Sequence, residues 1–127
     1  MPLEPTEVQL ARFVEPGVAE PVTMLNLLRF KDVADGIHAD EGISGAEAYA
    51  RYGAAIQENL RQVGAEIVWV GQCYDALIGP DEREWDAVAV VRYPSRDAFL
   101  TMVSDPVYQQ RHRHREAALA DSRLIPT

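Results

Sequence analysis

Residues 21–30, PVTMLNLLRF, decide the fold of this chain. Apolar side chains fill most positions between Val22 and Leu28, so a strand formed here carries apolar residues on both of its faces. Both faces of such a strand must be covered. Asn26 is the one amide in the run. A buried amide needs hydrogen-bond partners, so Asn26 is either tied to the backbone or aimed at a ligand.

Two helices are expected on either side of this strand. Thr6 with Gln9 fits a capping box, in which both side chains satisfy backbone N–H groups at a helix start, and predicts a short leading helix. Ser44 with Glu47 forms a second capping box. We expect one continuous helix over residues 44–64, because its apolar residues recur at helical spacing: Tyr49, Tyr52, Ile56, Leu60 and Val63.

The second half of the chain predicts a hairpin and two more helices. Residues 66–79 and 85–93 are rich in β-forming residues, and the polar residues 80–84, PDERE, form a turn between them. Pro94-Ser95 restarts a helix, and Asp105-Pro106 supplies the N-cap and first-turn proline of another. A short strand over residues 123–125 closes the chain.

After the leading helix the expected order is β-α-β-β-α-β. This is the α+β, ferredoxin-like arrangement, a four-stranded antiparallel sheet with helices on one face. No linker divides residues 1–127, so we expect a single domain with its core over residues 21–125. Helices on one face leave the other apolar face bare, and a second copy of the chain is the simplest cover. The sequence therefore predicts a homodimer.

The composition limits partners and chemistry. Among 127 residues, 20 Asp and Glu outweigh 12 Lys and Arg for a formal charge of −8, whereas nucleic-acid binding needs the opposite balance. No apolar run is long enough to cross a bilayer, and the acidic start differs from a secretory signal. With Cys73 as its one cysteine and no metal-ligand spacing, we expect a cytoplasmic protein without cofactor or metal.

Several motifs resemble an uncharacterised family of dimeric α/β-barrel proteins. They are Met24–Phe30, Tyr49-x-x-Tyr52-Gly53, Arg92-Tyr93-Pro94-Ser95-x-x-Ala98-Phe99, Asp105-Pro106-x-Tyr108, Arg115-x-Ala117 and Ser122-Arg123-Leu124. The resemblance covers residues 21–125 and is specific for the fold. It implies a dimer in which two sheets pack back to back, while each subunit keeps a cleft between its own sheet and helices.

Relatives in the wider superfamily have several activities. They include cofactor-free quinone-forming monooxygenases, haem-degrading monooxygenases, lactone isomerases, polyketide cyclases and ligand-binding regulators. In the haem-degrading relatives the site is formed by an Asn on the first strand, a Trp on a later strand and a His on the last helix. The corresponding residues here are Asn26, Trp69 or Trp85, and His112 or His114, although the motifs around them differ. Fold resemblance does not choose among these activities.

Two histidines on the last expected helix are candidates for acid–base chemistry. His112 and His114 are two residues apart, so they point in nearly opposite directions. His112 shares a face with Tyr108 and Arg115 and is the inward candidate, and an imidazole is the natural general acid or base near neutral pH. For His114 we favour the alternative, a side chain that meets solvent or acidic neighbours.

Aromatic and basic residues are the candidates for ligand binding. Tyr49, Tyr52 and Trp69 could line an aromatic pocket, although helical spacing equally suits core packing. Arg92 either binds a substrate carboxylate or forms a structural ion pair, for example with Asp86. Arg115 lies in the basic stretch after Asp105-Pro106, toward which an anionic or phenolic ligand would be drawn.

Residues 31–43 form a polar loop that contains four Asp or Glu residues and His38. The loop lacks the alternating acids of a calcium loop, and we expect a solvated acidic loop. The alternative is a mobile lid, since the loop is long and contains Gly36 and Gly42.

The sequence as a whole predicts a small dimeric, cofactor-free enzyme of monooxygenase, isomerase or cyclase type. Its substrate would be an aromatic or polyketide-like molecule. The alternative is a non-catalytic ligand-binding or structural dimer. In the enzyme hypothesis the catalytic residues are Asn26 and His112, and the ligand-binding residues are Tyr49, Tyr52, Trp69, Arg92 and Arg115.

Overall fold

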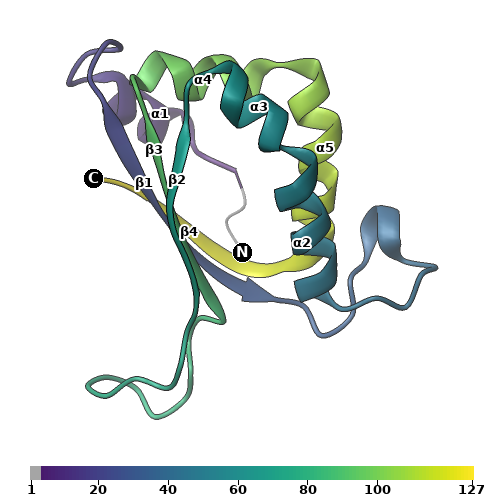
Figure 1. The fold of residues 1–127 in the computed structure, drawn as a ribbon. Coiled ribbons are helices and arrows are strands. Elements are labelled where there is room, and N and C mark those ends of the chain that lie inside the picture. The colour runs from purple at the N-terminus through teal and green to yellow at the C-terminus, as the bar shows by residue number, and fades with distance from the viewer. Residues whose placement is uncertain (1–3) are drawn as a thin grey trace.

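The computed structural model describes residues 4–127, which form a layer of helices over one face of a four-stranded sheet (Figure 1). The strands are β1 (Val22–Phe30), β2 (Glu66–Gln72), β3 (Ala87–Tyr93) and β4 (Leu119–Pro126). The helices are α1 (Glu7–Val14), α2 (Gly45–Ala55), α3 (Gln57–Gln62), α4 (Arg96–Ser104) and α5 (Pro106–Ala118), with a short 3-10 turn, η1 (Gly36–His38).

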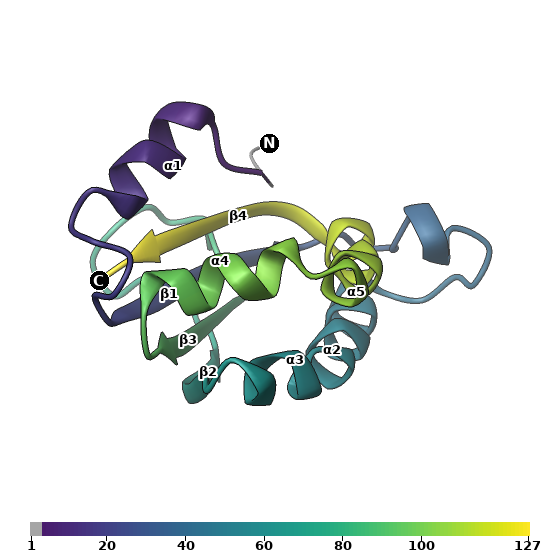
Figure 2. The same cartoon turned by 90° about the horizontal axis from the view of Figure 1, so that it is seen from above.

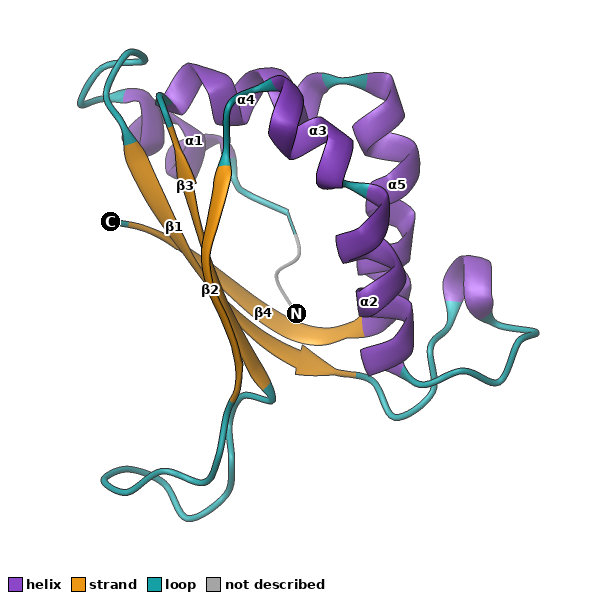
Figure 3. Cartoon of the chain, viewed as in Figure 1, coloured by secondary structure: helices purple, strands orange, loops and turns teal. Residues whose placement is uncertain are grey.

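The sheet has the strand order β2-β3-β1-β4, and every neighbouring pair is antiparallel. Helices α2 to α5 cover one face of this sheet (Figure 3), which confirms the expected ferredoxin-like α+β fold. Seen from above, η1 and its loop extend beyond α2 and α5, away from the sheet (Figure 2). No helix within residues 4–127 is both long and apolar enough to span a membrane.

Short-range capping signals set the helix starts. The Thr6 hydroxyl accepts from the Gln9 amide N–H at 3.1 Å, and the Gln9 side chain accepts in return from the Thr6 N–H at 2.9 Å. At α2 the Ser44 hydroxyl accepts from the Glu47 N–H at 3.0 Å. Both predicted helix starts are confirmed, because a capping box depends on residues three positions apart and needs no tertiary partner.

Three element boundaries differ from the sequence prediction. The helix expected over residues 44–64 is divided at Ile56, whose φ of −89° and ψ of 1° interrupt the α geometry between α2 and α3. The strand expected over residues 66–79 ends at Gln72, where the Cys73 N–H donates to the Asp86 carbonyl and closes the ladder. The last strand is longer than residues 123–125, because Leu119 is already extended where α5 ends.

Two hydrophobic clusters fill the space between helices and sheet. The larger includes Val22 and Met24 of β1, Tyr52 of α2, Tyr93 of β3 and Tyr108 of α5. The smaller consists of Leu28, Ala34, Ala48, Ala118 and Leu119. Tyr49 packs against both clusters. Along β1 the inward-facing residue between Met24 and Leu28 is Asn26, so the amide sits at the gap between the two apolar clusters.

The face of the sheet opposite helices α2 to α5 has an apolar centre. Cross-strand pairing places Leu25 opposite Val90 and Ile125, and Leu27 opposite Val88. Trp69 pairs with Val90 and therefore lies on the same face. We call this surface the outer face (Leu25, Leu27, Trp69, Val88, Val90 and Ile125). Strands with apolar residues on both faces match the pattern expected from residues 21–30.

Candidate functional site

Asn26 lies at the centre of a row of residues that crosses the whole inner face of the sheet. Its backbone partners are Ala89 on β3 and Leu124 on β4, and Ala89 in turn pairs with Val70 on β2. Ala89 is buried, whereas Val70 and Leu124 are 62% and 42% exposed. The row is therefore covered at its centre and open to solvent at both sheet edges.

The Asn26 side chain is tied to the backbone at one end and free at the other. Its Nδ2 donates to the Ala89 carbonyl at 3.1 Å. Its Oδ1 has no hydrogen-bond partner within residues 4–127. This oxygen is partly exposed, so water can reach it. The two sequence alternatives for Asn26 thus coexist, because the backbone bond fixes the amide and leaves its oxygen as an acceptor.

Five polar side chains form what we call the tyrosine–arginine cluster: Tyr49, Tyr52, Tyr93, Tyr108 and Arg115. They come from α2, β3 and α5. The Tyr52 and Tyr108 hydroxyls share a hydrogen bond of 2.7 Å. Burial raises the pKa of all four tyrosines above the ordinary value of 10, and the positive charge of Arg115 opposes that rise in each.

Arg115 is a buried cation that forms no ion pair within residues 4–127. The residue is 7% exposed, and a hydrogen bond with the guanidinium helps to lower the pKa of Tyr49. The nitrogen atoms of Arg115 are not completely enclosed, and each keeps a small area of contact with solvent. A desolvated charge is costly unless it is paired, so Arg115 is a candidate to bind an anion.

His112 lies at the edge of the same cluster. Its ring centroid is 5.7 Å from that of Tyr108 and 6.4 Å from that of Tyr52. Its Nδ1 is 3.4 Å from Oε1 of Glu116, and its side chain is 18% exposed. The helical-face argument therefore placed His112 beside the tyrosines correctly, and Nε2 has no protein partner within the described residues.

Trp69 and Arg92 do not lie with the other candidates. Trp69 is 62% exposed on the outer face, because an irregularity in β2 between Ile67 and Trp69 shifts the alternation of side chains. Arg92 pairs with Thr23 and is exposed, and its NH1 lies 3.7 Å from a Glu66 oxygen rather than near Asp86. Asn26 and Trp69 thus occupy opposite faces of the sheet and cannot share a haem site.

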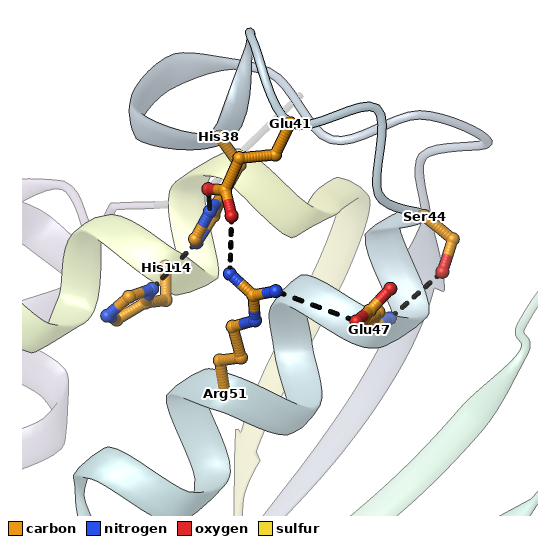
Figure 4. Close-up of polar contacts among 6 residues, drawn as sticks. All are labelled: His38, Glu41, Ser44, Glu47, Arg51 and His114. Carbon is orange, nitrogen blue, oxygen red and sulfur yellow. Dashed lines mark hydrogen bonds and ion pairs between the residues drawn. The ribbon is translucent and has the colours of Figure 1, made fainter.

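A second polar cluster joins the 31–43 loop to α2 and α5 (Figure 4). His38 is 4% exposed, and its Nδ1 bonds to the Glu41 carboxylate. His38 Nε2 lies 2.8 Å from Nδ1 of His114. The other Glu41 oxygen accepts from Arg51 at 2.7 Å. The four acidic residues of the loop, Asp32, Asp35, Asp40 and Glu41, are exposed as expected for a solvated acidic loop, whereas His38 is buried.

Sequence reasoning missed His38, Glu41 and His114 as a group. Two residues are three positions apart in an irregular loop, and the third is 76 positions further on. The spacing of His38 and Glu41 was the available signal, but nothing local indicated the partner on α5. Within residues 4–127, no group of three or more His, Cys, Asp or Glu side chains is placed to hold a metal ion.

One surface groove lies outside both clusters. It has a volume of about 510 Å³ and is open to solvent between α3 and β2, where its lining includes Glu58, Leu60, Arg61 and Ile67. None of the sequence-predicted site residues lines it. The candidate site is therefore the tyrosine–arginine cluster together with Asn26 and His112.

Comparison with known proteins places this architecture among domains without an assigned activity. The model of the domain of unknown function DUF1330 matches residues 38–126. The crystal structure of the RPA0582 protein of unknown function from Rhodopseudomonas palustris is 40% identical, with a TM-score of 0.87 over 98% of this chain and 94% of that one. No curated protein is significantly similar to the chain.

Two more distant structures share the fold. A protein from Bacteroides fragilis, described as dimeric, ferredoxin-like and of unknown function, is 12% identical with a TM-score of 0.54 over 84% of this chain and 94% of that one. A dimeric ferredoxin-like protein of unknown function from Thermobifida fusca is 13% identical, with a TM-score of 0.51 over 84% of this chain and 89% of that one.

Proposed function

The chain belongs to the DUF1330 family of domains of unknown function, and we propose that it binds a small anionic ligand, of phenolic, enolate or carboxylate character, at Arg115. The observation that supports this is the guanidinium itself. It is 7% exposed, it has no carboxylate partner within residues 4–127, and it still touches a water-sized space. An anion in that space would supply the missing counter-charge and gain a charge-assisted hydrogen bond.

The surrounding hydroxyls favour an aromatic or polyketide-like anion. The Tyr49 hydroxyl lies within hydrogen-bond reach of Arg115, and the Tyr93 hydroxyl has no hydrogen-bond partner within the described residues. Phenols can donate to an oxyanion while their rings pack against an apolar ligand body. Their raised pKa values keep them protonated near neutral pH, so all of them remain donors.

Catalysis would require proton transfer beside this anion site. In the enzyme form of the proposal, His112 Nε2 accepts a proton from a carbon next to a ligand carbonyl. The electron pair moves to the carbonyl oxygen beside Arg115, and Asn26 Oδ1 accepts a hydrogen bond from the substrate. Return of the proton to another carbon completes an isomerisation. Attack of the carbanion on a second carbonyl, with return of the proton to the resulting alkoxide, completes a cyclisation. Addition of the carbanion to O₂ gives a peroxide that takes up the proton and loses water to leave a new carbonyl, which is the monooxygenase route.

A homodimer is part of the proposed function. Each of the four strands contributes an apolar residue to the centre of the outer face, with Arg92 and Arg123 beside them, and the two distant relatives with this fold are described as dimeric. The β2–β3 connection supports the same arrangement. Figure 1 shows it projecting beyond the sheet with its tip bent away from the helices, and its residues Tyr74, Leu77 and Ile78 are 83%, 98% and 94% exposed.

The experiment that tests the ligand proposal compares two arginine variants of α5. Native mass spectrometry of the purified protein detects any co-purified anion, and calorimetry with 4-hydroxybenzoate measures binding of a defined aromatic anion. Arg115→Met is expected to abolish both signals, whereas Arg113→Gln, an exposed residue of the same helix, is expected to retain them. Equal binding by wild type and Arg115→Met would refute an anion site at Arg115.

Catalysis is tested separately from binding. His112→Ala and Asn26→Ala should lose turnover of any ligand so identified while keeping their melting temperature. If the ligand binds but neither variant changes the rate at which it is converted, the non-catalytic alternative replaces the enzyme hypothesis.

A further inference from the structure

The pairing of His38 with His114 links the 31–43 loop to α5 through a chain of hydrogen bonds. Glu41 is bonded to both His38 and Arg51, and its pKa is lowered, first by the His38 hydrogen bond and then by Arg51. The carboxylate is therefore ionised at neutral pH and acts as an acceptor. His38 Nδ1 must carry the proton that it donates to Glu41.

The hydrogen bond from His38 to Glu41 also determines which nitrogen of His114 carries a proton. With its Nδ1 proton donated to Glu41, a neutral His38 presents the lone pair of Nε2 to His114. The distance of 2.8 Å between His38 Nε2 and His114 Nδ1 then requires a proton on His114 Nδ1. The pair can accept one further proton, by charging His38 and making His114 the acceptor. It cannot accept two, because both facing nitrogens would then be donors.

The charges around the pair oppose a second proton as well. On α2, Arg51 forms ion pairs with Glu41 and with Glu47 and brings a positive charge close to the two imidazoles. From α5, Arg113 adds a second positive charge. The pKa of His114 is lowered, first by burial and then by His38, Arg51 and Arg113, with Glu41 acting in the opposite direction.

Other contacts also join the first part of the loop to α5. The Asp35 N–H donates to the Ala117 carbonyl at 3.2 Å, and Lys31 bonds Asp35 at 2.7 Å and the Glu116 carbonyl at 3.3 Å. These contacts are solvent-exposed and do not involve groups that titrate between pH 5 and 8. The hydrogen bond between the two imidazoles is thus the contact of the junction that depends on how many protons the pair carries.

We propose that His38 and His114 form an acid-sensitive latch, which holds the 31–43 loop on α5 at neutral pH and releases it when both imidazoles are protonated. The sign follows from linkage. A histidine whose pKa is lower in the latched state than the free value of about 6.5 binds fewer protons there, so latching is complete above that pH and is lost as pH falls. This inference is independent of the ligand site at Arg115.

Hydrogen exchange of loop amides measures the latch directly. The N–H groups of His38, Ala39 and Glu41 donate within the loop, to Asp35, Gly36 and His38 respectively, and report on its order. After correction for intrinsic exchange, their protection should fall roughly tenfold per pH unit once the second proton binds, between pH 6.5 and 5. The Leu60 amide, bonded to Ile56 in the helical layer, should keep its protection.

Two variants separate the latch from general acid effects. His114→Gln keeps an amide that can donate to or accept from His38 without titrating, so loop protection should persist to pH 5. His112→Gln lies on the same helix outside the pair and should show the wild-type loss. Protection that is equal at pH 7.5 and pH 5 in the wild type, or a pH-dependent loss that survives in His114→Gln, would overturn the proposal.

A third measurement covers a failed variant. If His114→Gln lacks loop protection even at pH 7.5, the wild-type protein provides the test. The chemical shifts of the carbon-bound ring protons of His38 and His114 are then followed by NMR as a function of pH. Their midpoint must coincide with the midpoint of the loss of loop protection, and a different midpoint refutes the latch.

Discussion

Tyr52 of α2 and Tyr108 of α5 lie 56 positions apart and share a hydroxyl–hydroxyl hydrogen bond of 2.7 Å inside the helical layer. Both residues are 6% exposed. Their bond joins α2 to α5, the helix that carries Arg115, so it fixes the position of the tyrosine–arginine cluster as well as the core. The bond is buried, and removal of one partner leaves the other hydroxyl unsatisfied.

Tyr52→Phe is expected to lower the free energy of unfolding by about 1–2 kcal/mol, because Tyr108 keeps a buried hydroxyl without its partner. Urea denaturation followed by circular dichroism measures the change. The double variant Tyr52→Phe/Tyr108→Phe should be no less stable than the single one. A double variant whose loss equals the sum of both single losses would show that the bond is not the source of the effect.

The tyrosine cluster also predicts how stability depends on alkaline pH. Burial raises the pKa of Tyr49, Tyr52, Tyr93 and Tyr108 in the folded protein, so the unfolded chain ionises first, near pH 10. Above that pH the folded state binds more protons, and stability should fall as pH rises. Absorbance at the tyrosinate band should rise together with unfolding, and four buried tyrosines that ionise in a still-folded protein would contradict this.

Arg115→Met should separate stability from binding. A buried guanidinium without a counter-ion destabilises the ligand-free protein, so methionine is expected to leave the free energy of unfolding unchanged or to raise it by about 1 kcal/mol. The same variant should lose anion binding. Denaturation of the ligand-free protein checks the first part, and a loss above about 2 kcal/mol would mean that Arg115 is a structural residue.

Two glycines of α2 offer a matched test of close packing. A Cβ on Gly45 would lie 2.3 Å from the Lys31 carbonyl oxygen and 2.5 Å from that of Ala118. Gly45→Ala must therefore displace backbone and should cost at least about 2 kcal/mol. Gly53 has nothing within 4 Å, and Gly53→Ala should stabilise the helix by about 0.5–1 kcal/mol. Melting temperatures that shift in the same direction for both variants would contradict the packing argument.

The outer face predicts the oligomeric state. Val90→Asp places a charge opposite Leu25, at the centre of the apolar surface, and should convert a dimer to a folded monomer in sedimentation velocity. Thr101→Asp, at an exposed position on α4, is the control and should remain dimeric. A wild-type monomer at micromolar concentration would exclude the homodimer.

The features that were predictable from sequence share one property, which is that their cause is local. Thr6 with Gln9 and Ser44 with Glu47 mark helix starts through contacts three residues apart. The strand around Asn26 was predictable because a run of apolar residues requires both faces of the strand to be covered, whichever elements cover them. The helical face that joins His112 to Tyr108 follows from backbone geometry alone.

The remaining features depend on register and on distant partners. Residues 67–70 are all apolar, so alternation could not tell which face Trp69 occupies, and one irregularity in β2 decided it. His38 is recognisable as special only once α5 brings His114 to within 2.8 Å. That Arg115 forms no ion pair within residues 4–127 is likewise a property of the fold, since Glu116 is its neighbour in sequence.

Helix α5 passes directly into β4, with Ala118 ending the helix and Leu119 beginning the strand. Arg115 and Ile125 of the outer face therefore lie on one segment that no loop interrupts. If anion binding at Arg115 and self-association through the outer face are coupled along this segment, each must change the free energy of the other by the same amount, so the coupling can be measured from either process.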